Sequence, residues 1–231
     1  MQSNQLTARI AGVLYLVVVL AGIFSLGYVP GQLHVAGDAA ATVANITAQE
    51  SLFRLGIAAG MVCYVAFLLL PLVLYRLLSP YGKVPGVLMV VFAVASVPMS
   101  LLALGHKLTV LSLLGDAEYL QLFSEAQRQA QVMLSLQAYR SALSVAEIFW
   151  GLWLLPFGYL VYTSRILPRV LGILLMLGSV GYLVEIFGDL LWTGYADSAL
   201  ARIAGIPASV GEIGICLWLL VMGARARRRL D

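Results

Sequence analysis

The sequence has few charged residues and few of the side chains that build catalytic or metal centres. Only 11% of its 231 residues are Asp, Glu, Lys or Arg, whereas 61% are hydrophobic. Soluble domains carry about 25% charged and about 45–50% apolar residues, so a water-soluble core could not bury this much apolar surface. The composition therefore excludes an ordinary soluble protein and predicts a chain that uses the lipid bilayer as its solvent.

The motifs that identify many enzymes and cofactor-binding proteins are also absent. The sequence contains no HExxH, no GxSxG, no P-loop and no dinucleotide fingerprint, and it has only two histidines, His34 and His106. Cys63 and Cys216 lie in apolar stretches outside any CxxC pattern, which favours a packing role, although a disulfide between them stays open. The sequence therefore predicts no metal, no cofactor and no catalytic residue.

Six apolar runs are long enough to cross a bilayer. A helical crossing needs about 20 residues, and only helices or closed barrels satisfy every backbone polar group in lipid. The sequence therefore predicts an all-α integral membrane bundle of six transmembrane helices, with a single domain over residues 1–231. The predicted spans are residues 7–28, 47–78, 84–113, 140–163, 168–192 and 207–223.

Local sequence also indicates where helices begin between the spans. Asp38 precedes helix-forming residues, as an N-cap does, and residues 47–50, TAQE, have the capping-box form in which Thr47 and Glu50 satisfy each other's backbone. Residues 116–137 repeat apolar positions at helical spacing with charges between them. They predict an amphipathic helix that lies on the outer surface or runs on into the fourth span.

Lys and Arg are distributed unequally between the two sides of the predicted bundle. Both termini share one side, which holds nine basic residues against five on the other. The positive-inside rule then predicts that both termini lie in the cytoplasm. Four of the nine follow the last span directly, which favours contact with membrane lipids over nucleic acid. The nine are Arg9, Arg76, Lys83, Arg165, Arg169 and the tail residues Arg225, Arg227, Arg228 and Arg229.

Apart from Glu50 at the start of the second span, carboxylates occur inside three of the predicted spans, and each lies in the outer half of its span. Glu185 and Asp189 lie one turn apart on the fifth span, Glu147 lies on the fourth and Glu212 on the sixth. A charge in hydrocarbon costs about 2.5–3.5 kcal/mol on insertion scales, so such groups face the bundle interior or a water-filled cavity. The sequence therefore predicts that the three glutamates converge in a polar pocket open to the outside.

Basic and aromatic residues near the outer ends of the spans complete this predicted pocket. Arg140 is the expected counter-ion of the glutamates, and Tyr182 extends the helical face that carries Glu185. The predicted ligand-binding residues are Glu147, Glu185, Glu212, Arg140, Asp189, Arg54, His106 and Tyr182.

Several of these residues also have simpler explanations. Arg54 could pair with Glu50 one turn earlier as a helix-end ion pair, and Asp189 is shallow enough to be solvated. Lys107 is expected to extend to the lipid headgroups, and His106 to be a packed or interfacial histidine. The glutamates could also form a structural ion-pair network that binds nothing.

Three classes of function fit these residues. A pocket with opposed charges favours binding or translocation of a small or lipid-like molecule, such as a zwitterionic or cationic amphiphile. An intramembrane enzyme would instead use paired glutamates, best Glu147 and Glu185, as general acid and base. A structural or assembly subunit would use the helix within residues 116–137 for docking. The sequence favours the first class, and it leaves the ligand, any catalysis and the oligomeric state open.

The sequence resembles a family of bacterial six-helix membrane proteins that is catalogued as a domain of unknown function, family 4386. The resemblance covers nearly the whole chain by pattern, and it implies an integral inner-membrane protein. No activity is established for that family, so the resemblance implies no functional residue. The segments that carry it are ARIAGVLYL, FRLGI, EIFWGLWLLPFGYLVY, ILPRVLGILLMLGSVGYL and GEIGICLWLL.

Overall fold

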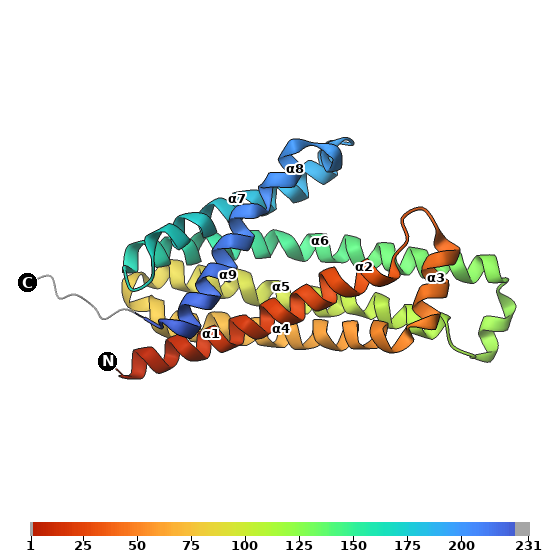
Figure 1. Ribbon diagram of the computed structural model, residues 1–231, viewed down its shortest axis with the longest axis horizontal. Helices are drawn as coiled ribbons and strands as arrows, with labels where there is room; N and C mark the ends of the chain where they lie inside the picture. Colours follow the sequence, from red (N-terminus) through yellow and green to blue (C-terminus); the bar gives the residue numbers. More distant parts are fainter. Residues whose placement is uncertain (1, 225–231) are drawn as a thin grey trace, which may run out of the picture. The chain divides into compact units, whose positions relative to one another are not determined.

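The chain folds into α-helices joined by turns, as Figure 1 shows for a computed structural model that describes residues 2–224. Within these residues there is no strand, and six helical segments are long and apolar enough to cross a membrane. The predicted all-α fold with six membrane-spanning helices is therefore confirmed. The predicted lipid contact of the tail arginines, Arg225, Arg227, Arg228 and Arg229, lies outside the described residues.

The crossings follow the predicted spans, with the largest differences at the first, fourth and sixth. The third and fifth spans correspond within a residue to α5 (Lys83–Leu113) and α7 (Arg169–Leu191). The first crossing continues to Leu33, and the sixth begins already at Ala199. The other helices of residues 2–224 are α1 (Gln2–Gly22), η1 (Ile23–Tyr28, a π-helix), α2 (Val29–Leu33), α3 (Ala39–Ala48), α4 (Glu50–Leu78), η2 (Ser79–Tyr81), η3 (Glu118–Leu122), α6 (Glu125–Ser164), η4 (Tyr195–Asp197), α8 (Ala199–Ala204) and α9 (Ile206–Val221).

Helix α6 combines the fourth crossing with most of the predicted amphipathic segment. It is 40 residues long. At 1.5 Å per residue it extends about 60 Å, roughly twice the thickness of the hydrocarbon core. Residues 125–150 contain no Gly or Pro, so no helix breaker separates the amphipathic part from the crossing. The run-on alternative is confirmed, and a separate surface helix over residues 116–137 is wrong.

The two predicted helix starts have different outcomes. Asp38 caps α3, because its Oδ1 accepts a backbone N–H of the first turn at 2.8 Å. The capping box at Thr47 is wrong, because α3 continues through this residue and its hydroxyl donates to the Val43 carbonyl at 2.9 Å. A capping box instead starts α6. There the Ser124 N–H donates to Gln127 Oε1 at 2.8 Å, and the Gln127 N–H donates to Ser124 Oγ at 3.3 Å.

The helices group into two compact units, and α1, α4, α5 and α6 each contribute residues to both. Unit 1 consists of Met1–Leu16, Ala66–Val97 and Val145–Asp231, and unit 2 of Val17–Val65 and Pro98–Ser144. Unit 1 therefore contains α7, α8 and α9, whereas unit 2 contains η1, α2 and α3. That the whole chain forms a single domain stays a prediction.

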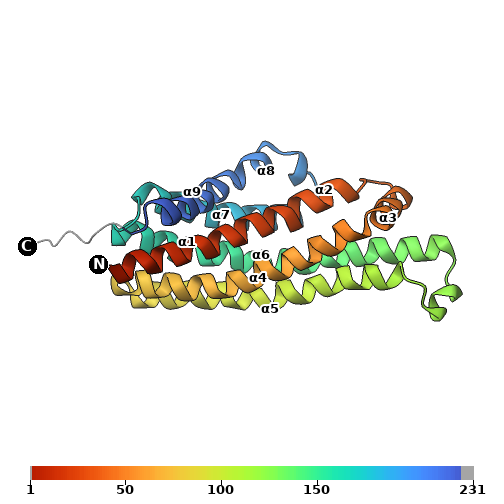
Figure 2. The same ribbon diagram turned by 60° about the horizontal axis from the view of Figure 1, so that its bottom comes forward.

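In unit 1 the helices α7 and α9 pack through small residues and lie side by side in both Figure 1 and Figure 2. A Cβ atom at Gly178 would lie 2.6 Å from Ala208 Cα on α9, and one at Gly181 would overlap the carbonyl oxygen of Ala204, the last residue of α8. Close approach through small residues is how helices associate in lipid, where apolar side chains gain little from leaving the hydrocarbon. These contacts set the register in which α7 and α9 present their acidic residues.

Large apolar side chains cover the outer faces of the helices. Leu102 is 77% exposed on α5, and Leu190 is 74% exposed on α7. Such extensive apolar surface is not tolerated on a soluble monomer, but it is what lipid tails require of a membrane-embedded helix. The chain is therefore an integral membrane protein that crosses the membrane several times.

Candidate functional site

Three helices of unit 1 bring the predicted glutamates near one tyrosine. The Tyr182 hydroxyl on α7 lies within electrostatic range of Glu147 on α6, Glu185 on α7 and Glu212 on α9. Glu147 and Glu185 also lie within electrostatic range of each other. All four side chains are half-buried. We call Tyr182, Glu147, Glu185 and Glu212 the acidic cluster.

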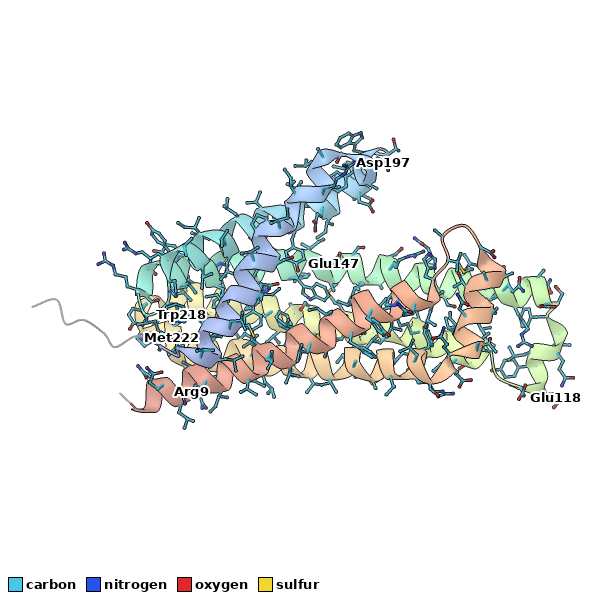
Figure 3. All side chains as sticks on the ribbon, viewed as in Figure 1. Arg9, Glu118, Glu147, Asp197, Trp218 and Met222 are labelled. Atoms are coloured by element: carbon cyan, nitrogen blue, oxygen red, sulfur yellow. The ribbon has the colours of Figure 1, made fainter. Side chains whose placement is uncertain are left out.

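Close packing of α6 against α7 brings Glu147 and Glu185 to the same level. A Cβ atom at Gly151 would lie 2.9 Å from Tyr182 Cβ, so the two backbones nearly touch at this point. Glu147 precedes Gly151 by one turn and Glu185 follows Tyr182 by about one turn. Because α6 and α7 run antiparallel, the two carboxylates lie on the same side of this contact. Figure 3 shows Glu147 in the middle stretch of α6.

Glu185 also lies against the beginning of α9. A Cβ atom at Gly205, the N-cap residue of α9, would lie 2.7 Å from Glu185 Oε1. The N-terminal end of a helix carries a partial positive charge, which stabilises a nearby carboxylate. Gly205 also ends α8, so the positive end of α9 and the negative end of α8 meet beside Glu185, and no basic side chain in the described residues forms a salt bridge with it.

Glu212 lies further than Glu185 from the end of unit 1 at which α7 is followed by α8. Its neighbour Gly211 packs against Leu175, which precedes Tyr182 by two turns, or about 10 Å along α7. The Tyr15 hydroxyl on α1 donates a hydrogen bond to Glu212 Oε1 at 3.2 Å, and Tyr15 is only 2% exposed. The cluster therefore continues from Glu147 and Glu185 inward to a hydrogen-bonded pair of Tyr15 and Glu212.

Aromatic side chains pack beside Tyr15 in the core of unit 1. The ring centre of Trp153 lies 6.3 Å from that of Tyr15, 5.1 Å from that of Phe67 and 5.0 Å from that of Phe157. Trp153 and Phe157 are fully buried. These contacts surround the inner end of the acidic cluster with rigid apolar packing.

The three glutamates have no salt bridge to a basic side chain within the described residues, where Arg54 and Glu50 form the one salt bridge, at 2.6 Å. The helix-end explanation of Arg54 is therefore confirmed. Arg140 is exposed and donates to Gln137 Oε1 at 2.8 Å on its own helix. Arg140 precedes Glu147 by two helical turns and takes a nearer partner, and its role as counter-ion of the glutamates stays a prediction.

The remaining predicted residues lie outside the acidic cluster. Asp189 is exposed near the end of α7, which agrees with the solvated alternative, and His106 is half-buried on α5 in unit 2. The expectation that Lys107 extends to the headgroups is wrong. Its side chain is 4% exposed, and its Nζ lies 4.1 Å from the ring centre of Tyr139.

Two tyrosines that belong beside the glutamates were not identified from the sequence. Tyr15 contacts Glu212 across a separation of 197 residues, so no local pattern could reveal the pair. Tyr195 follows α7, and its buried hydroxyl has no hydrogen-bond partner within the described part of the chain. Burial raises the pKa of Tyr195, and the negative charges of Glu185 and Asp189 raise it further.

The described residues offer no group of three or more His, Cys, Asp or Glu side chains that could hold a metal ion. Cys63 and Cys216 are buried and do not form a disulfide with each other, so the disulfide left open by the sequence does not form. That the protein needs no metal and no cofactor stays a prediction.

Comparison with known proteins identifies the family. Residues 10–223 match the family described as "Domain of unknown function (DUF4386)". The chain belongs to this family. An "Uncharacterized protein" of Archaeoglobus fulgidus is 33% identical to this DUF4386 protein over 90 residues, which are 39% of the chain and 51% of the relative. The match therefore spans about half of the relative's length. No solved structure matches this DUF4386 protein.

Proposed function

We propose that this membrane protein binds or translocates a small or lipid-like molecule with a positively charged group, through an outward-facing polar pocket lined by the acidic cluster. One observation carries the proposal. Glutamates from three helices lie within electrostatic range of Tyr182, and none of them has a basic partner in the described structure. Acidic residues inside a membrane bundle usually pair with each other, with bases or with a ligand. A cationic ligand would supply the charge that this cluster lacks.

The surroundings of the cluster favour an apolar cation over a small hydrated one. Trp153, Phe157 and Phe67 pack together beside Tyr15, so the inner end of the cluster is aromatic. Aromatic faces attract organic cations and also match their apolar parts. The expected ligand therefore combines a quaternary or protonated amine, or a similar cation, with hydrocarbon.

The spacing of the glutamates supports translocation as well as binding. Glu147 and Glu185 lie at one level, whereas Glu212 lies about 10 Å further along the bundle, beyond Tyr182. Successive acidic positions would let a cation move between sites without losing all of its compensating charge. We therefore propose that the ligand enters at Glu147 and Glu185 and moves toward Glu212.

We also propose that the protein lies in the inner membrane of a bacterium with both termini in the cytoplasm. Figures 1 and 2 show the N-terminus and the α4–α5 and α6–α7 connections of unit 1 at one end of this unit. These segments are rich in basic residues, as cytoplasmic connections are. The five basic residues in or near them are Arg9, Arg76, Lys83, Arg165 and Arg169.

Two lipophilic ions of equal shape and opposite charge test the proposed function. We expect the purified protein in dodecyl maltoside to bind tetraphenylphosphonium and not tetraphenylborate. Glu185→Gln and Glu212→Gln should each weaken tetraphenylphosphonium binding by at least about tenfold, because each removes a charge from the cluster. Equilibrium binding of the radiolabelled cation provides the measurement.

Glu118→Gln is the matched control, because Glu118 is exposed on η3 in unit 2. This variant should bind tetraphenylphosphonium as the unmodified protein does. Equal binding of both ions, or unchanged binding after replacement of all three cluster glutamates, would contradict the proposal.

An intramembrane acid–base reaction is a second candidate, supported by the proximity of Glu147 to Glu185. General acid–base catalysis needs two such groups at one reacting centre. Mass spectrometry of molecules that copurify with the protein separates the two candidates. A molecule retained unchanged after incubation supports binding, and a molecule converted only when both glutamates are present supports catalysis.

A further inference from the structure

Unit 2 contains a buried lysine that has no anionic partner among the described residues. Lys107 on α5 is 4% exposed, and its Nζ lies 4.1 Å from the ring centre of Tyr139 on α6. The ring face attracts the ammonium charge, but it does not replace the strong acceptors that three N–H donors require. The one salt bridge within residues 2–224 joins Arg54 to Glu50 and leaves Lys107 out.

A second buried polar group lies near Leu104, which precedes this lysine by one turn on α5. Ser25 in the π-helix η1 is 1% exposed, and its Oγ has no hydrogen-bond partner in the described part of the chain. A Cβ atom at Gly60 would lie 2.9 Å from Ser25 Oγ and 3.2 Å from Leu104 Cδ2. Leu104 precedes Lys107 by one turn, and helical side chains lean toward the N-terminus, so the lysine extends toward this contact.

The segment that carries Ser25 has an unusual geometry. A π-helical stretch inserts an extra residue into an α-helix, and such stretches occur frequently at functional sites. Here the stretch Ile23–Tyr28 contains Ser25 as its buried residue. The irregular turn therefore directs a hydroxyl, in place of an apolar side chain, into the interior of unit 2.

A buried apolar cluster begins one helical turn beyond Lys107 on α5. Val110 follows Lys107 by one turn on α5, and Val132 precedes Tyr139 by two turns on α6. Both belong to a buried cluster that also contains Val29, Leu33, Ile46, Phe53 and Ile57. A small hydrated anion would lose its water shell here without compensation, whereas an anion attached to hydrocarbon would match the surroundings.

We propose that Lys107, Tyr139 and Ser25 form a binding site for the oxyanion of an amphiphile, which is a carboxylate or phosphate carried on a hydrocarbon chain. The oxyanion accepts hydrogen bonds from the Lys107 ammonium and the Ser25 hydroxyl, and the Tyr139 ring holds the ammonium in place. The hydrocarbon packs against the apolar cluster. This site takes an anion, whereas the acidic cluster takes a cation, so either proposal can be correct when the other is wrong.

Binding of named lipids to the purified full chain in dodecyl maltoside tests this site. The probes are oleate and dioleoylphosphatidylglycerol, with the uncharged monoolein for comparison, and native mass spectrometry and thermal shifts give the affinities. We expect Lys107→Gln to weaken binding of the anionic probes at least tenfold and to leave monoolein unchanged. Lys83→Gln is the matched control, because Lys83 is an exposed lysine on the same helix; it should bind every probe as the unmodified protein does.

Two further variants show whether weaker binding results from loss of the site or from loss of folding. Lys107→Arg keeps the positive charge and should retain most of the binding, and Ser25→Ala should weaken it severalfold in a protein of unchanged helicity. Preference for oleate assigns the site to a fatty carboxylate, and preference for dioleoylphosphatidylglycerol assigns it to a lipid phosphate. The proposal is overturned if neither anion binds better than monoolein, or if Lys107→Gln and Ser25→Ala bind both anions undiminished. Retained tetraphenylphosphonium binding in Lys107→Gln shows that the acidic cluster is unaffected.

Discussion

Single residues show how this protein tolerates charge inside helices that face lipid. Glu212 accepts a hydrogen bond from a buried tyrosine, Glu185 lies at the positive end of α9, and Lys107 lies on an aromatic ring. None of these three contacts supplies an ion of opposite charge, and the one salt bridge of the described residues joins Arg54 to Glu50. All three groups therefore retain the capacity to bind an ion of opposite charge.

The hydrogen bond between Tyr15 and Glu212 can be tested by its effect on stability. Tyr15→Phe leaves a carboxylate without its donor in an apolar environment and should lower the free energy of unfolding by about 1–3 kcal/mol. In a Glu212→Leu background, where no acceptor remains, the same change should cost much less. Unfolding in mixed micelles of dodecyl maltoside and sodium dodecyl sulfate measures both values.

Tyr159→Phe is the control for this experiment, because Tyr159 is 48% exposed on α6. Loss of its hydroxyl should hardly change the free energy of unfolding. Additive effects of Tyr15→Phe and Glu212→Leu would mean that the two side chains do not interact energetically.

Helices in unit 1 are held together by backbone contact at small residues. Gly158 and Gly172 join α6 to α7, since a Cβ atom at either position would lie within 2.7 Å of the other's carbonyl oxygen. Gly12 joins α1 to α9 in the same way, with Leu220 N 2.7 Å from its would-be Cβ atom. The positions of the glutamates on three helices depend on these contacts, because they determine the register of each helix pair.

A pair of glycine substitutions separates packing from helix propensity. Gly178→Ala should lower the free energy of unfolding by about 1–3 kcal/mol, because its Cβ atom would lie 2.6 Å from Ala208 Cα and force α7 and α9 apart. Gly105→Ala on α5 has nothing within 4 Å of its Cβ atom. It should raise the free energy of unfolding by about 0.5–1 kcal/mol, because alanine favours the helix. Changes of the same sign in both variants, measured in the same mixed micelles, would argue against the small-residue packing.

At the scale of the whole molecule, the even number of crossings is the property with the clearest consequence. We expect the six candidate crossings among residues 2–224 to place both ends of this part of the chain on one side of the membrane. Figure 3 shows Asp197, after α7, at the end of unit 1 opposite to Arg9 on α1. A reagent confined to one side of the membrane should therefore distinguish the two ends of this unit.

Cysteine labelling in intact cells tests this topology. Asp197→Cys should react with a membrane-impermeant maleimide from outside, whereas Lys83→Cys should react only after the membrane is permeabilised. The native Cys63 and Cys216 are 6% and 2% exposed, so their background labelling should be low. The opposite pattern would place the termini outside the cytoplasm and reverse the proposed direction of ligand entry.

Interactions between residues close together in the chain could be predicted from the sequence. The crossings follow from apolar runs, the Asp38 cap from its place before a helix-forming segment, and the Arg54 pair from its spacing to Glu50. The local predictions that failed did so where one helix competed with another for the same residues. Thr47 lies within α3 because that helix continues, and the capping box at Ser124 and Gln127 starts the helix that runs on into the fourth span.

The sequence by itself determined that the protein is helical, how often it crosses the membrane and which helices carry acids, because hydrocarbon imposes these properties on each segment separately. Only the tertiary structure decided which buried charges have partners. Tyr15 meets Glu212 because Gly12 lets α1 approach α9 closely, and Lys107 meets Tyr139 where α5 lies against α6. A register depends on the shapes of two surfaces at once, so the pattern of one segment cannot specify it.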